Sequence, residues 1–268
     1  MPGAEKDSLN RPLQGKRVAV TRPTEQAERL VEGLESLGGD TLACPTIRIG
    51  DPADPGALAR SVEHLDRYDW IVFTSVNGVR RFWSVLEKLM NRPRLPDGAR
   101  VAAIGPATAD ALVSLGVRPV VVPDEYVAEA VADALIATDD MSGRRVLLPR
   151  AAGARKVLPD RLAAAGAVVD EVVAYEAYAN PEGIAELRGA IDRGEVEMVT
   201  FTAASTVRHF VEHAGSDLGE ARVAVIGPIT AEAAESVGVR VDVEAEEYTV
   251  DGLLRAICDY YTMSEERG

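Results

Sequence analysis

The sequence predicts an α/β protein built from two doubly wound parallel sheets, because it repeats itself and because strands alternate with helices within each copy. Val101–Val121 and Val223–Val243 are identical at 13 of 21 positions. Two shorter segments also recur: Gly15–Arg22 as Gly143–Arg150, and Phe73–Phe82 as Phe201–Phe210. Repeats of this length indicate two similar domains from an internal duplication. Alternating strands and helices indicate a parallel sheet with helices on both faces.

The first copy begins with Arg17–Thr21, a continuous apolar run of the kind found in buried parallel strands. The helix after it, Thr24–Leu37, has apolar residues at helical spacing and is stopped by two glycines. The same criteria predict further elements. Strands are expected at Thr41–Ile49, Trp70–Thr74, Val101–Ile104 and Val117–Val122, and helices ending at Leu89, over Pro106–Leu115 and over Tyr126–Ala137.

The second copy follows the same order. Its strands are expected at Arg145–Leu148, Val168–Tyr175, Met198–Thr202, Val223–Ile226 and Val239–Val243. A helix runs to Ala165 and is closed by Gly166. Five strands in each copy predict a flavodoxin-like sheet with the strand order 2-1-3-4-5.

Two turn-rich linkers, Gly50–Pro55 and Tyr178–Gly183, follow the second strand of each copy. The junction between the copies, Thr138–Gly143, is only a short polar turn. The copies can therefore lie in tandem, or each can place its first strands in the other's domain. The sequence is equally compatible with both arrangements.

Composition excludes several classes of function. The net charge of −14 argues against nonspecific nucleic-acid binding, although a pocket can still be locally positive. Cys44 and Cys258 have no CxxC spacing, which is typical of reduced thiols in a cytoplasmic protein. No apolar run is long enough to span a membrane. The first fourteen residues lack a signal-peptide core and, with the last seven, are expected to be disordered tails.

The turns after the third and fourth strands of each copy are the candidate ligand-binding segments, because ligands of parallel sheets bind beyond the carboxyl ends of the strands. There, helix N-termini direct free N–H groups and a positive dipole end at an anion. Glycine also lets backbone approach a ligand closely. Ordinary helix capping is the alternative explanation. The candidate substrate-binding residues are Thr74, Ser75, Asn77, Gly105, Thr108, Thr202, Ser205, Gly227 and Thr230.

Three arginines are further candidates for binding a carboxylate. Arg22 and Arg150 end the first strand of each copy, and Arg155 lies just beyond the second of them. A guanidinium can hold a carboxylate through two parallel hydrogen bonds. Solvated surface arginines are the alternative.

Tyr175 breaks the symmetry of the repeat, because the first copy has Ile47 at the matching position. A phenol is protonated at neutral pH and can donate a proton or a hydrogen bond. A tyrosine that merely packs between the domains is the alternative.

No metal or nucleotide site is expected. His209 and His213 are four residues apart, but neither an HExxH motif nor a cysteine accompanies them. The glycine-rich motifs of dinucleotide and Walker-type sites are also missing from the sequence.

Seven phrases along the chain together resemble the uroporphyrinogen-III synthase family, cytosolic enzymes of tetrapyrrole and heme biosynthesis. They are VAVTRP, WIVFTSVNGV, VAAIGPATADAL, LLPRAAGARKVLP, VVAYEAY, VTFTAASTV and VAVIGPITAEAA, and they span about Gly15 to Ile257. The resemblance implies two flavodoxin-like domains joined by a two-stranded connection, in the exchanged arrangement. One domain would contain residues 1–46 and 179–268 and the other residues 50–173, with linkers at about 47–49 and 174–178.

The resemblance also implies a reaction. Hydroxymethylbilane, a linear tetrapyrrole with many carboxylates, would lie in the cleft between the domains, lose a hydroxyl group as water, and close into uroporphyrinogen III. The last pyrrole ring is inverted through a spiro intermediate. Such a lyase uses no metal or organic cofactor. Tyr175 would be the proton donor, and we expect a monomer without a nucleic-acid or membrane partner. Residues at family positions facing the cleft are Thr74, Ser75, Thr108, Arg155, Ser205 and Thr230.

A binding or sensor module for a small polyanion is the alternative, because two lobes around a cleft also describe solute-binding proteins. Incubation with hydroxymethylbilane and separation of the product isomers distinguishes the two functions.

Overall fold

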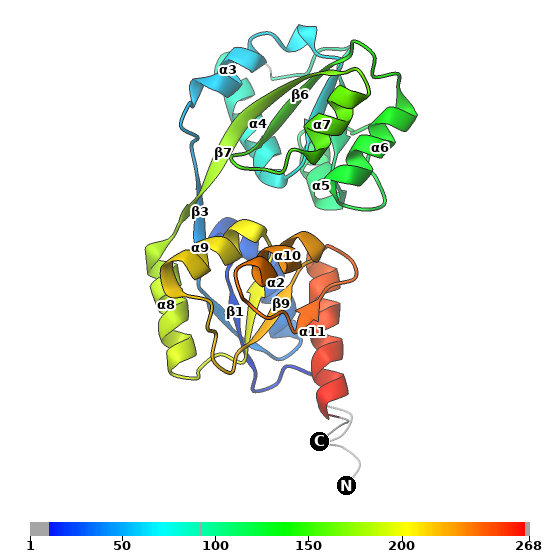
Figure 1. Ribbon diagram of the computed structural model, residues 1–268. Coiled ribbons are helices and arrows are strands. Elements are labelled where there is room, and N and C mark those ends of the chain that lie inside the picture. Colours follow the sequence, from blue (N-terminus) through cyan, green and yellow to red (C-terminus); the bar gives the residue numbers. More distant parts are fainter. Residues whose placement is uncertain (1–10, 92, 266–268) are drawn as a thin grey trace. The chain divides into compact units, whose positions relative to one another are not determined.

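The computed structural model describes residues 11–91 and 93–265 and divides the chain into two compact units. Unit 1 contains Met1–Ile49 and Tyr178–Gly268, and unit 2 contains Gly50–Ala177. The boundaries expected from the resemblance lie a few residues from these. Each unit is an α/β structure around one five-stranded sheet (Figure 1).

The sheet of unit 1 combines strands from both ends of the chain. Its order is β10-β9-β8-β1-β2, which in terms of the repeat is 2-1-3-4-5 read from the other edge. β1 pairs in parallel with β2 and with β8, so Val18 lies opposite both Thr41 and Met198. The structure therefore has the exchanged arrangement. The strands are β1 (Arg17–Val20), β2 (Asp40–Ala43), β8 (Met198–Phe201), β9 (Arg222–Val225) and β10 (Val243–Glu244).

Helices cover both faces of this sheet. Successive residues of a strand point to opposite faces, and here both sets are apolar and are buried under helices. Val18 and Val20 pack with Leu30 of α2 and Leu253 of α11, whereas Ala19 lies in the core with Phe210 of α9. The helices of unit 1 are α2 (Thr24–Ser36), α8 (Pro181–Asp192), α9 (Ala204–Ala214), α10 (Pro228–Ser236) and α11 (Val250–Glu265).

The sheet of unit 2 has the order β3-β7-β6-β4-β5. β3 and β7 are neighbours in it, and both crossings of the chain between the units belong to these two strands. The strands are β3 (Ile47–Gly50), β4 (Trp70–Phe73), β5 (Arg100–Ala103), β6 (Arg145–Ala151) and β7 (Val168–Ala179). The helices are α3 (Gly56–Val62), α4 (Val76–Leu89), α5 (Pro106–Ser114), α6 (Ala128–Thr138) and α7 (Val157–Ala164), with a 3-10 turn at Leu65–Arg67.

Three predicted strands differ from the structure, and prolines explain two of the differences. The expected strand Val239–Val243 is reduced to the two residues of β10, Val243–Glu244, and shares only Val243 with it. The expected strand Thr41–Ile49 is divided into β2 and β3, which belong to different sheets, and Pro45 lies at the break. The expected strand Val117–Val122 contributes only an isolated bridge between Ala102 and Val121. Pro119 lies inside that segment, and a proline lacks the N–H group that a regular ladder needs.

The linker and tail predictions also need correction. Tyr178–Gly183 is no loop, because β7 continues to Ala179 and α8 begins at Pro181. In the expected N-terminal tail, Leu13 is fully buried and its N–H donates to the Leu37 carbonyl at 3.1 Å. Residues 262–265 of the expected C-terminal tail belong to α11. Residues 1–10 and 266–268 of those predicted tails lie outside the described part. Within the described residues, no helix has both the length and the apolar character needed to cross a membrane.

Candidate active site

A β-bulge places the Tyr175 side chain. Along β7 the buried residues alternate, with Val172 and Ala174 turned inward, and strict alternation would expose Tyr175. The register shifts between Arg150 and Ala151 of β6, so that Ala151 lies opposite Tyr175. Such an irregularity re-aims the side chain that follows it. The Tyr175 side chain is consequently buried, with 7% of its surface exposed.

The Tyr175 hydroxyl lies 2.9 Å from Oγ of Ser75, the N-cap residue of α4. Ser75 Oγ also accepts a hydrogen bond from the Gly78 N–H at 3.0 Å. Burial raises the pKa of the Tyr175 phenol above its usual value of 10, although hydrogen bonds with Ser75 and Asn77 and the charge of Arg150 act in the opposite direction. The phenol is therefore protonated at neutral pH, and it is held at the start of a helix.

Arg150 is buried beside this phenol and has its own protein partners. Its Nη1 lies 3.0 Å from a Glu171 carboxylate oxygen, and its Nη2 donates to the Arg155 carbonyl. Only 7% of the residue is exposed. Arg150 thus holds the loop after β6 and places a positive charge near Tyr175. Direct binding of a ligand carboxylate by Arg150 stays a prediction.

Arg155 is also paired within unit 2. Its two terminal nitrogens contact both carboxylate oxygens of Glu129, at 2.9 and 3.2 Å. The pair is partly exposed, so solvent weakens its attraction. A substrate carboxylate would have to displace Glu129 to bind Arg155 in the predicted way.

The N-cap glycines of α5 and α10 have a packing role, and their close approach to a ligand stays a prediction. A Cβ atom on Gly105 would meet Cδ1 of Tyr126 at 2.9 Å, and one on Gly227 would meet Cδ1 of Tyr248 at 2.6 Å. A tyrosine ring fills the space that each missing side chain leaves open. Sequence reasoning missed both tyrosines as site neighbours, although the recurrence of Glu-Tyr at 125–126 and 247–248 was a usable signal.

The threonines that follow these glycines are buried. Thr108 and Thr230 each lie in the first turn of their helix with 4% of their surface exposed. Among the predicted substrate-binding residues at the helix starts, these two threonines have the most deeply buried side chains.

Unit 1 presents the matching helix start without a cap. Ala203 is the N-cap residue of α9 and has no hydroxyl to accept from the first amides, whereas Ser75 does this for α4. Thr202 and Ser205 flank it, and both are half-buried. The first turn of α9 therefore lacks the side-chain acceptor that α4 has.

Arg22 follows β1, at the end of the unit 1 sheet where the start of α9 also lies. Because Val20 lies opposite Thr200 on the neighbouring strand, Arg22 comes beside the segment that leads into α9. The residue is half-buried, and desolvation lowers the pKa of its guanidinium. No ion-pair partner for it exists among residues 11–91 and 93–265. Arg22 and the uncapped start of α9 are together suited to an anion.

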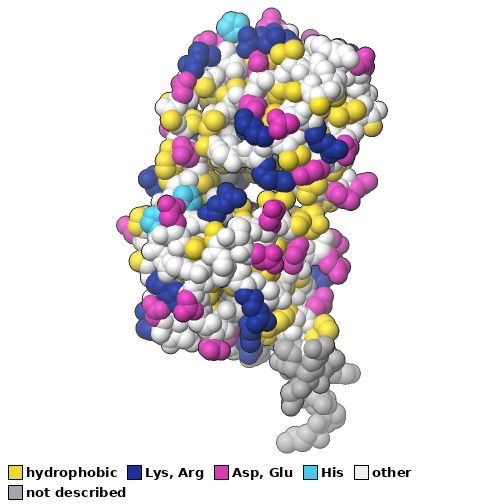
Figure 2. Space-filling view, viewed as in Figure 1, with side chains coloured by type: hydrophobic (Ala, Val, Ile, Leu, Met, Phe, Trp, Pro, Cys, Tyr) yellow, Lys and Arg dark blue, Asp and Glu magenta, His cyan; other side chains and the backbone are white. Residues whose placement is uncertain are grey.

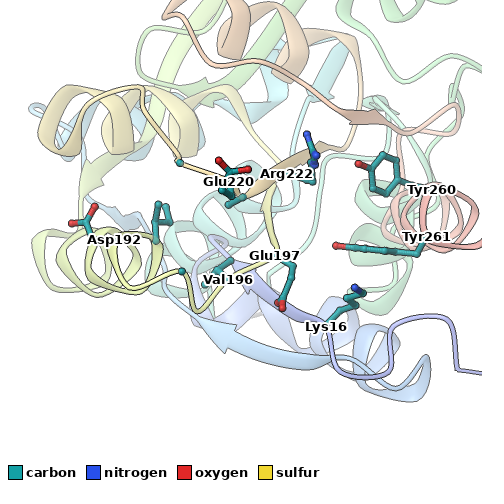
Figure 3. Close-up of a pocket in the computed structure, with 12 residues that line it drawn as sticks. Lys16, Asp192, Val196, Glu197, Glu220, Arg222, Tyr260 and Tyr261 are labelled. Atoms are coloured by element: carbon teal, nitrogen blue, oxygen red, sulfur yellow. The ribbon is translucent and has the colours of Figure 1, made fainter. Parts of the chain in front are cut away.

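A separate cavity of about 540 Å³ lies in unit 1, at the end of the sheet where the strands begin (Figure 3). Its lining includes Lys16, Glu197 and Arg222, which stand where β1, β8 and β9 begin. Glu197 already accepts from the Arg17 N–H at 2.6 Å, and Arg222 lies 3.4 Å from Asp242. None of the predicted site residues lines this cavity, so the candidate active site is elsewhere.

The candidate site residues therefore form two groups, one in each unit. Unit 2 brings together Tyr175, Ser75, Asn77 and Arg150, a set able to donate a proton and stabilise the resulting phenolate. Unit 1 places Arg22 next to the segment that carries Thr202 and Ser205, a set able to bind an anion.

Comparisons with known proteins agree with one another. The family model for uroporphyrinogen-III synthase HemD matches residues 28–255. The chain is 31% identical to the uroporphyrinogen-III synthase of Synechococcus elongatus over 92% of this chain and 96% of that protein. It is 30% identical to the Chlorobaculum parvum enzyme of the same name, over 91% and 98%. The crystal structure of a mutant uroporphyrinogen III synthase from Thermus thermophilus has a TM-score of 0.64 and 23% identity, covering 93% of this chain and 99% of that one.

Proposed function

The chain belongs to the uroporphyrinogen-III synthase family, and we propose that Tyr175 is the proton donor for its cyclisation of hydroxymethylbilane to uroporphyrinogen III. The observation that supports this role is the contact between the buried Tyr175 hydroxyl and Ser75 at the start of α4. The proposed reaction is that of a lyase, which needs neither a metal nor an organic cofactor.

The proposed step is a proton transfer and loss of water, followed by ring closure. The Tyr175 proton moves to the hydroxyl group of the substrate, the carbon–oxygen bond breaks with its electron pair on oxygen, and water leaves. The remaining azafulvene cation is attacked by a carbon of the last pyrrole ring. After that ring is inverted through the spiro intermediate, the loss of one proton from the closed ring returns Tyr175 to the phenol form.

Ser75 supports this step by hydrogen bonding. Its oxygen accepts from the Gly78 N–H, so its own O–H group can donate to the Tyr175 oxygen. That direction leaves the phenol proton available for the leaving hydroxyl and stabilises the phenolate as it forms. The positive charge of Arg150 lowers the Tyr175 pKa, as the Ser75 hydrogen bond does.

The carboxylates of the substrate are proposed to bind at helix starts in both units. In unit 1 the supporting features are Arg22, without an ion-pair partner in the described residues, and α9, which has no side-chain cap. In unit 2 they are the first turn of α5 with Thr108, and Thr74 and Ser75 at the start of α4, where the Ser75 cap occupies only the Gly78 amide. Helix N-termini stabilise anions through their free N–H groups and their dipole.

Three finer features belong to the same proposal. The two units descend from one duplicated flavodoxin-like domain, which the recurrence of Gly105 and Tyr126 as Gly227 and Tyr248 supports. The enzyme acts as a monomer. It acts in the cytoplasm, with both Cys44 and Cys258 as free thiols.

Product analysis tests the proposal. Purified protein, incubated with hydroxymethylbilane and no added cofactor, should give the type III isomer, whereas uncatalysed closure gives type I. Tyr175→Phe keeps the ring and removes the proton, so we expect kcat to fall by about 100-fold or more, the range of general acid catalysis. Far-UV circular dichroism should show an unchanged fold. Type I product alone would disprove the activity, and undiminished kcat would remove Tyr175 from the mechanism.

A further inference from the structure

We propose that His209, Glu212 and His213 of α9 form a binding site for a divalent transition-metal ion of the class of Zn²⁺, Ni²⁺ or Cu²⁺. One ligand atom from each residue lies within 4.8 Å of the other two. Residues three and four apart share one face of a helix, so the three side chains converge on the same side of α9. Figure 2 shows histidine side chains gathered with an acidic one on the surface of unit 1.

The tautomer of His213 is suited to a metal. Its Nδ1 atom lies 2.9 Å from the backbone carbonyl oxygen of His209. A carbonyl only accepts, so Nδ1 carries the proton and the lone pair is on Nε2. A metal-binding imidazole is typically held in this way, with its other nitrogen donating to a carbonyl or carboxylate.

Glu212 supplies a third ligand, although it belongs to no metal-binding motif of the sequence. One of its carboxylate oxygens lies 3.8 Å from Nδ1 of His209, and its side chain is 70% exposed. Small rotations of these side chains can bring two imidazoles and a carboxylate to one ion. Two nitrogens and one oxygen are the donors that zinc and its neighbours prefer, and water can complete the coordination.

The position on the helix favours a cation. α9 ends at Ala214, so the three residues lie in its last two turns, at the negative end of the helix dipole. The chain carries a net charge of −14, which adds to the attraction. The proposed site is at the opposite end of α9 from Ala203, and it does not depend on the proposed function.

Isothermal titration of the full chain with ZnCl₂ tests the site. We expect one saturable site per chain, and at least about tenfold weaker binding, or about 1.4 kcal/mol, in His213→Gln. The double variant His209→Gln/His213→Gln should show no saturable site. His64→Gln, which changes the one histidine outside the cluster, is the matched control and should bind as the unmodified protein does.

Two further measurements make the result decisive. MgCl₂ should not bind at the cluster, because Mg²⁺ prefers oxygen donors to imidazole. Zn²⁺ should raise the melting temperature of the unmodified protein and not that of the double variant, because an ion that binds only the folded state stabilises it by mass action. Saturable Zn²⁺ binding that survives in the double variant, equal binding of Mg²⁺, or no saturable Zn²⁺ binding to the unmodified protein would overturn the proposal.

Discussion

At the scale of single residues, the two matching helix starts differ by one hydroxyl. Ser75 caps α4 and contacts Tyr175, whereas Ala203 stands at the matching N-cap of α9 and Ile47 matches Tyr175. One unit therefore has the proposed proton donor where the other has an uncapped helix. The pair offers two complementary substitutions, one removing the hydroxyl and one adding it.

Ser75→Ala should slow turnover and move its alkaline limit upward. The Ser75 hydrogen bond lowers the Tyr175 pKa, so its loss raises that pKa further above 10. Because the protonated phenol is the proposed active form, kcat/KM should then decline only at a higher pH. The measurement is the pH profile of kcat/KM, with Ser75→Thr as the control that keeps a hydroxyl. An alkaline limit that moves down, or does not move, would contradict the proposed coupling.

The same pKa shift has a consequence for stability. Burial raises the folded-state pKa of Tyr175 above the unfolded value, so the folded state holds this proton more tightly. The contribution of this group to stability is fully present below about pH 10 and is lost as the pH rises through the folded pKa.

Ala203→Ser should stabilise unit 1 and weaken substrate binding. The backbone at Ala203 is extended, with φ of −159° and ψ of 148°, close to that of the Ser75 cap. A serine there can accept from the first turn of α9 and contribute about 1 kcal/mol. The new hydroxyl occupies amides that we propose for a substrate carboxylate, so KM should rise while kcat changes little.

Urea unfolding and initial-rate kinetics measure the two effects of Ala203→Ser. Ala204→Ser is the control, because it puts the hydroxyl inside the helix, where it does not cap. A stabilised protein with an unchanged KM would show that the start of α9 does not bind the substrate.

At the scale of elements, the sequence predicts best where packing is local. Every helix that it places, including Thr24–Leu37 and Pro106–Leu115, is found within a few residues, because apolar periodicity and capping are local signals. The division of Thr41–Ile49 between two sheets is not local. It depends on Pro45 and on which strands from elsewhere in the chain pair with each half.

The candidate site shows the same limit. The sequence identifies Ser75 and Tyr175, but nothing in it indicates the bulge that turns Tyr175 inward. It also assigns Arg155 to a ligand, whereas Glu129, 26 residues away in the chain, is its partner in the structure. Pairings between distant segments decide which polar groups are already satisfied, and periodicity carries no information about them.

Two glycines of α8 should respond oppositely to alanine. A Cβ on Gly183 would lie 2.1 Å from the backbone oxygen of Pro45, where the chain passes from β2 to β3. Backbone cannot give way as a side chain can, so Gly183→Ala should destabilise unit 1 by about 1–3 kcal/mol. A Cβ on Gly189 meets only the end of the Arg193 side chain, at 3.0 Å.

Gly189→Ala is therefore the matched control, and it should be neutral or stabilising by up to about 1 kcal/mol. Urea midpoints followed by circular dichroism compare the two variants. Equal effects of the two substitutions would show that the contact between α8 and Pro45 is not tight in solution.

At the scale of the whole molecule, each unit has its own core, and the two tryptophans, Trp70 and Trp83, both lie in unit 2. Tryptophan fluorescence should therefore follow the unfolding of unit 2 alone. In Gly183→Ala, we expect the circular dichroism transition to acquire an earlier phase from unit 1, while the fluorescence midpoint stays within error. Coincident shifts in both signals would mean that the units unfold as one cooperative body.

The pairing of β1 with β8 has a consequence for biosynthesis. Thr21 donates a hydrogen bond to the carbonyl of Thr200, which is 179 residues later. At translation speeds of about 5–20 residues per second, the amino-terminal strands wait on the order of 10–40 s for their partner to leave the ribosome. Unit 2 can be complete once β7 has emerged, while β1 still exposes both of its apolar faces. The nascent chain can thus fold from its middle outward, with the amino-terminal strands completing their sheet last.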